Sequence, residues 1–446
     1  MDTPICDFVT RYAESGFLRG HMPGHKGVVL TGPEPRDITE IAGADSLYEA
    51  NGIIRESEEN AGMLFGANTL YSTEGSSQCI RAMVYLAALY AKKRGHVRKI
   101  LAARNAHKTF LSAAALCDVE VEWLTGGEGI SYLSCPVDAE MVETALRNME
   151  EKPAAVYLTS PDYLGNLMPV ADIAVVCHRH GVLLLVDNAH GAYLKFLPES
   201  CHPMDLGADI CCDSAHKTLP ALTGAAYLHI APHAPEFLHN QAKTAMAMFG
   251  STSPSYLILQ SLDAVNAYLA NGYRERLEAF VWQVDALKDR LTAHGYKLCG
   301  QERTKLVIDA KDYGYAGTEL ADLLLESRIA VEFADPDFLV MMVTLETGGE
   351  GLFRMEAALC AIPRREAVLE APPAFSLPER AMSIREAAMS LCETVEASAS
   401  LGCVLAAATV GCPPAVPIVA CGERIDEAAL RCFAYYGIDR CTVVIE

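Results

Sequence analysis

The sequence predicts an α/β fold in which helices cover a largely parallel β-sheet, followed by a smaller α/β region. Two observations carry this prediction. Between residues 99 and 230, short apolar runs alternate with helical patterns, as in repeated strand–helix–strand units. The run at 182–186 reads VLLLV, without a charge, as expected for a strand buried on both faces of a parallel sheet. Ligands of such sheets bind outside the carboxyl ends of the strands, so the residues that follow each strand are the candidates for function.

The elements of the predicted sheet region follow one another closely. A helix is expected at 53–65, where apolar residues such as Ile54, Ala61 and Phe65 lie beside a glutamate-rich face. Further helices are expected at 78–93, 107–117, 138–149, 170–180 and 235–249, and strands at 70–73, 99–102, 119–124, 154–158, 182–186, 208–212 and 225–230.

A long, mostly helical pattern at 257–293 precedes the C-terminal region. A proline-rich linker at 372–378 interrupts the C-terminal region. We predict an N-terminal arm at 1–40, a large domain with a bridging helix at 41–295 and a small domain at 296–446. In the small domain, strands are expected at 305–309, 338–344 and 441–445, and helices at 317–327, 351–361 and 383–399.

Composition narrows the possible partners. The formal net charge of −21 argues against nucleic acid, because nucleic-acid binding requires basic patches. It would favour a cationic small molecule, although acidity also serves solubility. The uncharged stretch 403–421 contains Gly411 and three prolines, which break a helix, so no membrane span is expected.

The spacing of the cysteines and histidines in the sequence does not predict a metal site. Residues 1–19 lack the apolar core of a secretory signal, so the 16 cysteines are expected to be reduced thiols of a cytoplasmic protein. They include no CxxC pair, and zinc is therefore not expected. His178 and His180 lie two residues apart on a predicted helix and do not share a face, so we expect no metal there either.

A carboxylate and an amine follow two neighbouring predicted strands. Asp187 ends the 182–186 run, and Lys217 comes shortly after the 208–212 run. This pairing suits pyridoxal 5'-phosphate (PLP), because a lysine amine forms a Schiff base with the aldehyde and a carboxylate keeps the pyridine nitrogen protonated. The alternative is an acidic strand end and a lysine on a surface loop.

Two further segments fit such a cofactor. Gly75, Ser76 and Ser77 open the 78–93 helix, and a glycine–hydroxyl turn at a helix start binds phosphate through free N–H groups. Serine is also a common helix cap without a ligand. His107 follows a strand and could lie flat against an aromatic ring, or begin a helix as a core residue.

Several motifs in order carry a resemblance to a known family. The chain resembles the Orn/Lys/Arg decarboxylases, PLP enzymes of aspartate-aminotransferase-like fold, in the short bacterial form without a wing domain. The segments that carry the resemblance are HMPGHKG, GIIRESEENAGMLFGA, TEGSS, RNAHK, TSPDYLGN, VDNAHGAYLKF, DSAHKTLPALTGAAYLH, STSPSYLILQSLDAV and PPAVPIVACGE. The resemblance implies a fold-type I enzyme with a mostly parallel seven-stranded sheet, working as a homodimer or dimer-based oligomer.

The resemblance also assigns roles by position. Lys217 would hold PLP, Asp187 would pair with its pyridine nitrogen and His107 would stack on its ring; His216 or Lys217 would return the proton to the substrate's α-carbon. Gly75, Ser76, Ser77, Ser214 and His216 would hold the phosphate. Ala189 would pack on the ring's other side, His190 would line the pocket nearby, and Thr252 and Ser253 would reach the partner subunit's site.

The implied activity is decarboxylation of arginine, lysine or ornithine to an amine for polyamine metabolism. The chain departs from the family pattern late in the sequence: Ala407 stands where an acid is usual, and Cys412 and Ala415 replace a tyrosine and a glycine. Glu332 is then a remaining candidate to bind the distal cation of the substrate, and the alternative is a solvated glutamate without that role. Another PLP reaction, such as transamination or elimination, and a non-catalytic PLP-binding paralogue stay open.

Overall fold

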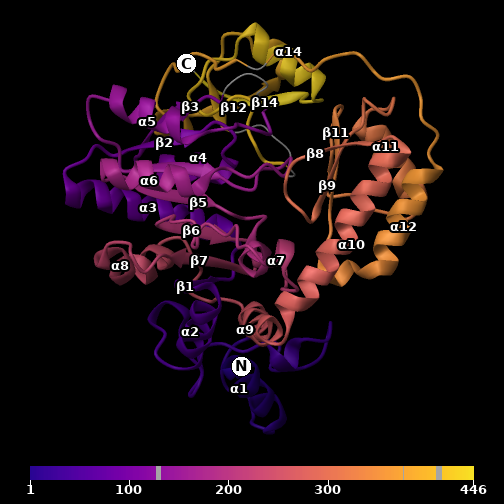
Figure 1. The fold of residues 1–446 in the computed structure, drawn as a ribbon. Helices are drawn as coiled ribbons and strands as arrows, with labels where there is room; N and C mark the ends of the chain where they lie inside the picture. The colour runs from indigo at the N-terminus through magenta and orange to yellow at the C-terminus, as the bar shows by residue number, and fades with distance from the viewer. Residues whose placement is uncertain (127–131, 375, 408–413, 446) are drawn as a thin grey trace. The chain divides into compact units, whose positions relative to one another are not determined.

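The computed structural model describes residues 1–126, 132–374, 376–407 and 414–445 (Figure 1). These residues form two compact units. Unit 1 comprises 1–97, 151–156 and 170–275, and unit 2 comprises 98–150, 157–169 and 276–446. The boundaries at 40/41 and 295/296 that the sequence suggests stay a prediction. Within the described residues, no helix is long and apolar enough to cross a lipid bilayer.

The predicted parallel sheet is present and has seven strands, hydrogen-bonded in the order β1-β7-β6-β5-β4-β2-β3. Strand β5 is parallel to β6 and β2 is parallel to β3, whereas β7 is antiparallel to both of its neighbours. The strands are β1 (Asn68–Ser72), β2 (Lys99–Ala103), β3 (Glu120–Leu124), β4 (Ala155–Thr159), β5 (Leu183–Asp187), β6 (Ile210–Asp213) and β7 (Ala226–Ile230). The fold-class prediction is confirmed, and each predicted strand lies within a few residues of its expected place.

Strand β5 is central: every one of its residues is buried, as the charge-free run at 182–186 predicted. It pairs with β6 so that Asp187 lies opposite Cys212, which brings the carboxyl ends of both strands together. In unit 1, α3 (Ser76–Arg94) packs on β5, β6 and β7, and α6 (Val170–His180) packs on β5. These helices cover the sheet and leave the strand ends to the loops.

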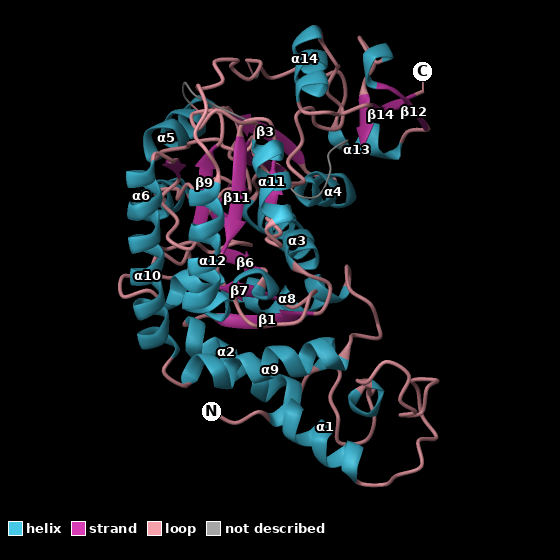
Figure 2. Ribbon diagram, turned by 90° about the vertical axis from the view of Figure 1, so that its right-hand side faces the viewer, coloured by secondary structure: helices cyan, strands magenta, loops and turns pink. Residues whose placement is uncertain are grey.

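Three helices pack together near the N-terminus. They are α1 (Pro4–Glu14), α2 (Ile53–Phe65) and α9 (Tyr256–Ala270), and α2 also lies beside β1 in both views (Figures 1 and 2). Asp263 on α9 joins them: it accepts the N–H groups of Ile5 and Cys6 and the hydroxyl of Ser57. Helix α2 has the predicted bounds, whereas α1 lies within a segment for which the sequence predicted only an arm.

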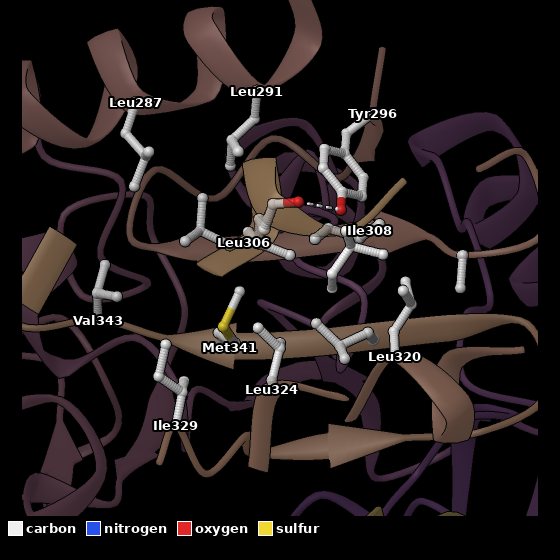
Figure 3. Packing of buried hydrophobic residues seen from close by; sticks show 14 of the residues in the cluster. Leu287, Leu291, Tyr296, Leu306, Ile308, Leu320, Leu324, Ile329, Met341 and Val343 are labelled. Atoms are coloured by element: carbon white, nitrogen blue, oxygen red, sulfur yellow. Dashed lines mark hydrogen bonds between the residues drawn. The ribbon is translucent and has the colours of Figure 1, made fainter. Parts of the chain in front are cut away.

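Unit 2 contains a four-stranded antiparallel sheet in the order β10-β11-β9-β8. Its core is formed by Leu287, Leu291, Leu306, Met341 and neighbouring residues (Figure 3). The strands are β8 (Lys297–Cys299), β9 (Lys305–Asp309), β10 (Phe333–Ala334) and β11 (Phe338–Met342), and the covering helices are α10 (Tyr273–His294), α11 (Gly317–Glu326) and α12 (Gly348–Ala361).

The remaining α-helices and strands lie in both units. They are α4 (Lys108–Cys117), α5 (Ala139–Asn148), α7 (Ala215–Thr218), α8 (Glu236–Ala247), α13 (Ile384–Met389), α14 (Glu427–Tyr435), β12 (Cys392–Glu396), β13 (Leu405–Ala407) and β14 (Arg440–Val444). The three strands form a third sheet in the order β12-β14-β13.

The predicted helix at 383–399 is wrong. Ser383 and Glu386 form a capping box that starts α13, but the helix ends at Met389. The chain then forms β12, in which Thr394 pairs with Thr442 and Val395 with Cys441 of β14. Pairing with a strand almost fifty residues away has overridden the local helical pattern, as tertiary contacts commonly do for β-branched residues.

Candidate active site

The end of β5 presents a buried carboxylate. Asp187 is only 2 % exposed. Its Oδ1 accepts the N–H of Ala189 at 3.2 Å and the thiol hydrogen of Cys212 at 3.7 Å. A carboxylate in this position can pair with a cationic partner, such as a protonated ring nitrogen.

Lys217 lies at the same edge of the sheet. It belongs to α7, a single turn that starts after Ser214 at the end of β6. Its Nζ lies 3.0 Å from Nε2 of His190, which follows β5 by three residues. The structure therefore brings together Asp187, His190 and Lys217, as expected when parallel strands end side by side. At this distance the amine and the imidazole share a hydrogen-bonding proton.

The glycine–serine turn before α3 meets the lysine segment. Gly75 has a φ of +71°, which favours glycine, and its N–H donates to Gly224 O at 2.7 Å. Ser214 Oγ donates to Ser76 Oγ at 2.9 Å, which joins the two predicted phosphate-binding segments. Helix α3 has no side-chain cap, so its first turn offers backbone N–H groups to an anion. Ser77 is the second residue of this helix.

His216 completes this group of residues. Its Nδ1 donates to Ala225 O at 3.0 Å, because a carbonyl oxygen can only accept. In its neutral form, the ring therefore carries its proton on Nδ1 and has Nε2 as an acceptor.

The serine-rich turn at 250–253 is tied to the phosphate-binding segment. The backbone N–H of Ser251 donates to a carboxylate oxygen of Glu74, the residue before Gly75. A Cβ at Gly250 would collide with Tyr48 Oη, so glycine is required there. Thr252 and Ser253 are exposed. Their predicted contact with a partner subunit stays a prediction.

A buried network behind the strand ends was not predicted from the sequence. Asp213, the last residue of β6, accepts Nε2–H of His202 at 2.9 Å, Nε2–H of His229 at 3.1 Å and Nδ2–H of Asn188 at 2.6 Å. Burial alone would raise the pKa of Asp213, but the two histidines hold it below its ordinary value. The network links Asn188, next to Asp187, with Asp213, next to Ser214, and so fixes both strand ends.

Two predicted site residues belong to unit 2. His107 caps α4, with Nδ1 accepting the N–H of Thr109 at 3.1 Å. This is the helix-start alternative that its sequence context allowed. Stacking of His107 on the cofactor ring stays a prediction. Glu332 is exposed, and its Oε1 accepts the hydroxyl hydrogen of Tyr163 at 2.9 Å. The hydrogen bond holds this carboxylate in one orientation.

Three positions depart from the family pattern, and the structure describes two of them. Ala407 is an exposed residue at the end of β13. Ala415 is buried with a φ of +57°, a conformation that favours the glycine of the pattern, and its carbonyl accepts the N–H of Lys108. Cys412 lies outside the described residues.

The residues of unit 1 fit a pyridoxal phosphate group. They provide a lysine amine, a buried carboxylate, hydroxyls and an uncapped helix start at one edge of the sheet. A family model described as "Orn/Lys/Arg decarboxylase, major domain" matches residues 3–308. The chain belongs to this family. It is therefore a PLP-dependent amino-acid decarboxylase with the fold-type I architecture.

Curated relatives agree with this assignment. The chain is 29 % identical to an arginine decarboxylase of Halalkalibacterium halodurans, over 91 % of this chain and 87 % of the relative. It is also 29 % identical to an arginine decarboxylase of Bacillus subtilis, over 75 % of this chain and 72 % of the relative.

Solved structures share the fold. The lysine decarboxylase LdcF of Francisella novicida has a TM-score of 0.78 at 19 % identity, covering 99 % of this chain and 79 % of that chain. The constitutive lysine decarboxylase of E. coli has a TM-score of 0.78 at 18 % identity, covering 100 % of this chain and 82 % of that chain.

Proposed function

We propose that this decarboxylase acts on a cationic amino acid, with arginine the first candidate and lysine and ornithine next. The observation that carries the proposal is the convergence of Lys217, His190 and Asp187 at one sheet edge, beside the Gly75–Ser76 segment. The arginine preference rests on the two curated relatives named above. The product amine would enter polyamine metabolism, in the cytoplasm.

The proposed roles follow from the donors and acceptors at this edge. When bound, PLP supplies an electron-accepting ring for the electron pair that departing carbon dioxide leaves on the α-carbon. Asp187 would hold the ring nitrogen in its protonated form, and Lys217 would hold the aldehyde carbon. Gly75, Ser76 and Ser214 would hold the phosphate through N–H and hydroxyl groups.

Proton movements are assigned to three side chains. His190, 3.0 Å from Lys217 Nζ, would accept a proton from the ammonium and so make the amine a nucleophile. After carbon dioxide leaves, Lys217 or His216 would return a proton to the α-carbon. His107 would stack on the ring.

The decisive experiment measures carbon dioxide and amine from arginine, lysine and ornithine in turn, with the PLP-loaded protein. We expect one of the three to be decarboxylated, and Lys217→Ala to lose both turnover and the visible absorbance of the bound cofactor. A keto acid product would favour transamination. Bound cofactor without any product would favour a non-catalytic PLP-binding protein. The reason to consider this alternative is that Ala407 stands where the family usually has an acid.

The substrate's distal charge gives a second test. We propose Glu332, oriented by Tyr163, as the acceptor of that charge. Glu332→Gln should raise KM for the substrate about tenfold, the usual size of one lost charge-assisted hydrogen bond, while kcat changes less. Glu326→Gln, at another exposed glutamate, is the matched control. Equal KM values for both variants would remove Glu332 from the site.

We also propose that the protein is a homodimer. The arm leaves Leu18 97 %, Leu30 79 % and Phe17 71 % exposed, which is unusual for a monomer. Leu18→Glu combined with Leu30→Glu should shift the protein to monomer in sedimentation velocity. Leu391→Glu, at an exposed leucine outside the arm, should not. A wild-type monomer would contradict the proposal.

A further inference from the structure

Three side chains that commonly bind metals converge at the amino-terminal edge of strand β6. Asp209 immediately precedes β6, His178 lies in the last turn of α6, and His233 follows β7. The convergence follows from the topology, because β7 is antiparallel to β6 and pairs Ile230 with Ile210. The segment after β7 therefore returns to the start of β6, where Ala231 N–H donates to Asp209 O at 2.9 Å.

The ligand atoms face one another. Nε2 of His178 lies 3.2 Å from Oδ2 of Asp209, and Nε2 of His233 lies 3.5 Å from Oδ1. The two imidazole rings are 5.3 Å apart, at 71° to each other. All three ligand atoms lie within 4.8 Å of one another.

The carboxylate is held in place, and the histidines leave an open side. The Asp209 side chain is only 5 % exposed, and its Oδ2 accepts Leu184 N–H at 2.7 Å. The His178 and His233 side chains are 41 % and 46 % exposed. A fixed, buried ligand with two accessible imidazoles allows a hydrated ion to enter from solvent and keep a water in its remaining position.

We propose that His178, Asp209 and His233 bind a Zn²⁺-type divalent cation. In a tetrahedral zinc site, with bonds of about 2.0–2.2 Å, neighbouring ligand atoms are about 3.3 Å apart. Each imidazole nitrogen lies at about this spacing from one oxygen of the carboxylate, Oδ2 for His178 and Oδ1 for His233. Two imidazoles and a carboxylate suit zinc or a neighbouring late transition metal better than Ca²⁺ or Mg²⁺. On binding, the cation replaces the proton between His178 and Asp209, which leaves to solvent.

This site is distinct from the active site. Asp209 and Asp213 lie four residues apart at opposite ends of β6, a span of about 13 Å. Lys217 and Asp187 lie at the Asp213 end. A cation at the Asp209 end would join α6, β6 and the segment after β7. It would stabilise the folded protein and would take no part in the decarboxylation reaction. The proposal departs from the expectation of no metal site, because the ligands come from three separate elements.

A second group of possible ligands supports no such inference. His202, Cys211 and Asp213 lie close together but are fully buried. Both nearby histidines and Asn188 already donate to Asp213. A cation there would have no path from solvent and would disrupt a complete hydrogen-bond network.

The test is equilibrium dialysis of the PLP-loaded protein against micromolar free Zn²⁺ in reducing buffer. Wild type should retain one more zinc per chain than the variant combining His178→Ala and His233→Ala. Cysteine binding cancels in this comparison, because both proteins have the same thiols. Zinc should also raise the midpoint of thermal unfolding of wild type by at least about 2 °C, and not that of the variant.

Two more variants complete the design. His239→Ala, at a partly buried histidine of α8 outside the group, should keep the extra zinc. Asp209→Asn preserves an acceptor for Leu184 N–H, but should lose the zinc. The PLP absorbance of each variant checks that it is folded. The proposal is overturned if wild type and the double variant retain equal zinc, or if His239→Ala loses as much.

Discussion

Asp335 is a buried carboxylate whose proton affects stability. It is 6 % exposed, and burial raises its pKa to about 6, although the N–H groups of Phe338 and Asp337 donate to it. The ordinary pKa of an aspartate, which we take for the unfolded chain, is 3.8. Between these values the folded state binds more protons, so this group's contribution to stability falls as pH rises from about 4 to about 6 and stays low above.

The consequence is a pH-dependent effect of Asp335→Asn. The amide oxygen can still accept the two N–H groups, and no charge is buried. We expect the variant to be more stable than wild type by about 1–2 kcal/mol at pH 7.5, with the difference lost near pH 4. Urea unfolding at both pH values measures this. Asp289→Asn, at an exposed aspartate, is the control; a difference that is constant with pH would contradict the argument.

Ala415 gives a prediction about backbone conformation. A φ of +57° costs alanine about 1 kcal/mol, whereas glycine adopts it freely but loses more chain entropy on folding. Ala415→Gly should therefore leave the free energy of unfolding unchanged or raise it by up to about 1 kcal/mol. Ala415→Val should lower it by about 2 kcal/mol or more, because a β-branched residue is strained there. Denaturant titration of both variants tests the order.

At this scale the sequence predicted that some of the candidate residues lie close together and missed other contacts. Asp187 and Lys217 each follow an apolar strand, so the hydrophobic pattern predicted that both lie at the same edge of the sheet. The contacts of Asp213 with His202 and His229 were not, because these residues come from different elements and share no spacing in the sequence. The sequence also could not place His233 beside Asp209, since that requires knowing that β7 is antiparallel.

At the scale of elements, the start of α3 offers a matched experiment. Gly75 and Gly95 lie at opposite ends of this helix and both have a φ of +71°. Gly95 has a ψ of 25°, in the left-handed helical region, where alanine should cost about 1 kcal/mol, whereas Gly75 has a ψ of 178°, where alanine should cost about 1–3 kcal/mol. Only Gly75→Ala should also weaken PLP binding, by about tenfold, because the turn at Gly75 positions the N–H groups for the phosphate. Fluorescence titration with PLP separates the two effects; equal affinities would contradict the phosphate role.

Helices and strands were predictable where local pattern and packing agree. Helix α2 has an apolar stripe that faces β1 and α9, and its bounds were predicted correctly. The 383–399 segment was predicted wrongly because its strand depends on β14, which the local sequence does not contain. The arm's helix α1 was missed for a related reason: its first turn is held by Asp263, far along the chain.

At the scale of the whole molecule, the cofactor should contribute to stability. A ligand that binds only the folded state stabilises it by about 2.7 kcal/mol at a hundredfold excess over its dissociation constant. The PLP-loaded protein should therefore melt at a higher temperature than the cofactor-free protein. Differential scanning calorimetry measures the increment, and Lys217→Ala should reduce it. The same increment in Lys217→Ala would argue that the covalent bond to Lys217 adds nothing to PLP affinity.

The fold class was readable from the sequence because alternating strands and helices have few ways to form a sheet. The compact units were not, since both are assembled from segments that are distant in the sequence. The charge of −21 argued against nucleic acid as a partner but could not identify the substrate.

The hydrogen bond from Ser251 to Glu74 links the 250–253 turn to the segment proposed to hold phosphate. If Thr252 and Ser253 reach the other subunit of the proposed dimer, PLP binding at one site would change how well ordered the other subunit's site is. Cofactor uptake would then be cooperative, with a Hill coefficient above unity in titrations of the stripped protein. Glu74→Ala, which removes the acceptor of the Ser251 N–H, should reduce that coefficient toward unity while each site still fills. Independent filling in wild type would show that the two sites do not communicate.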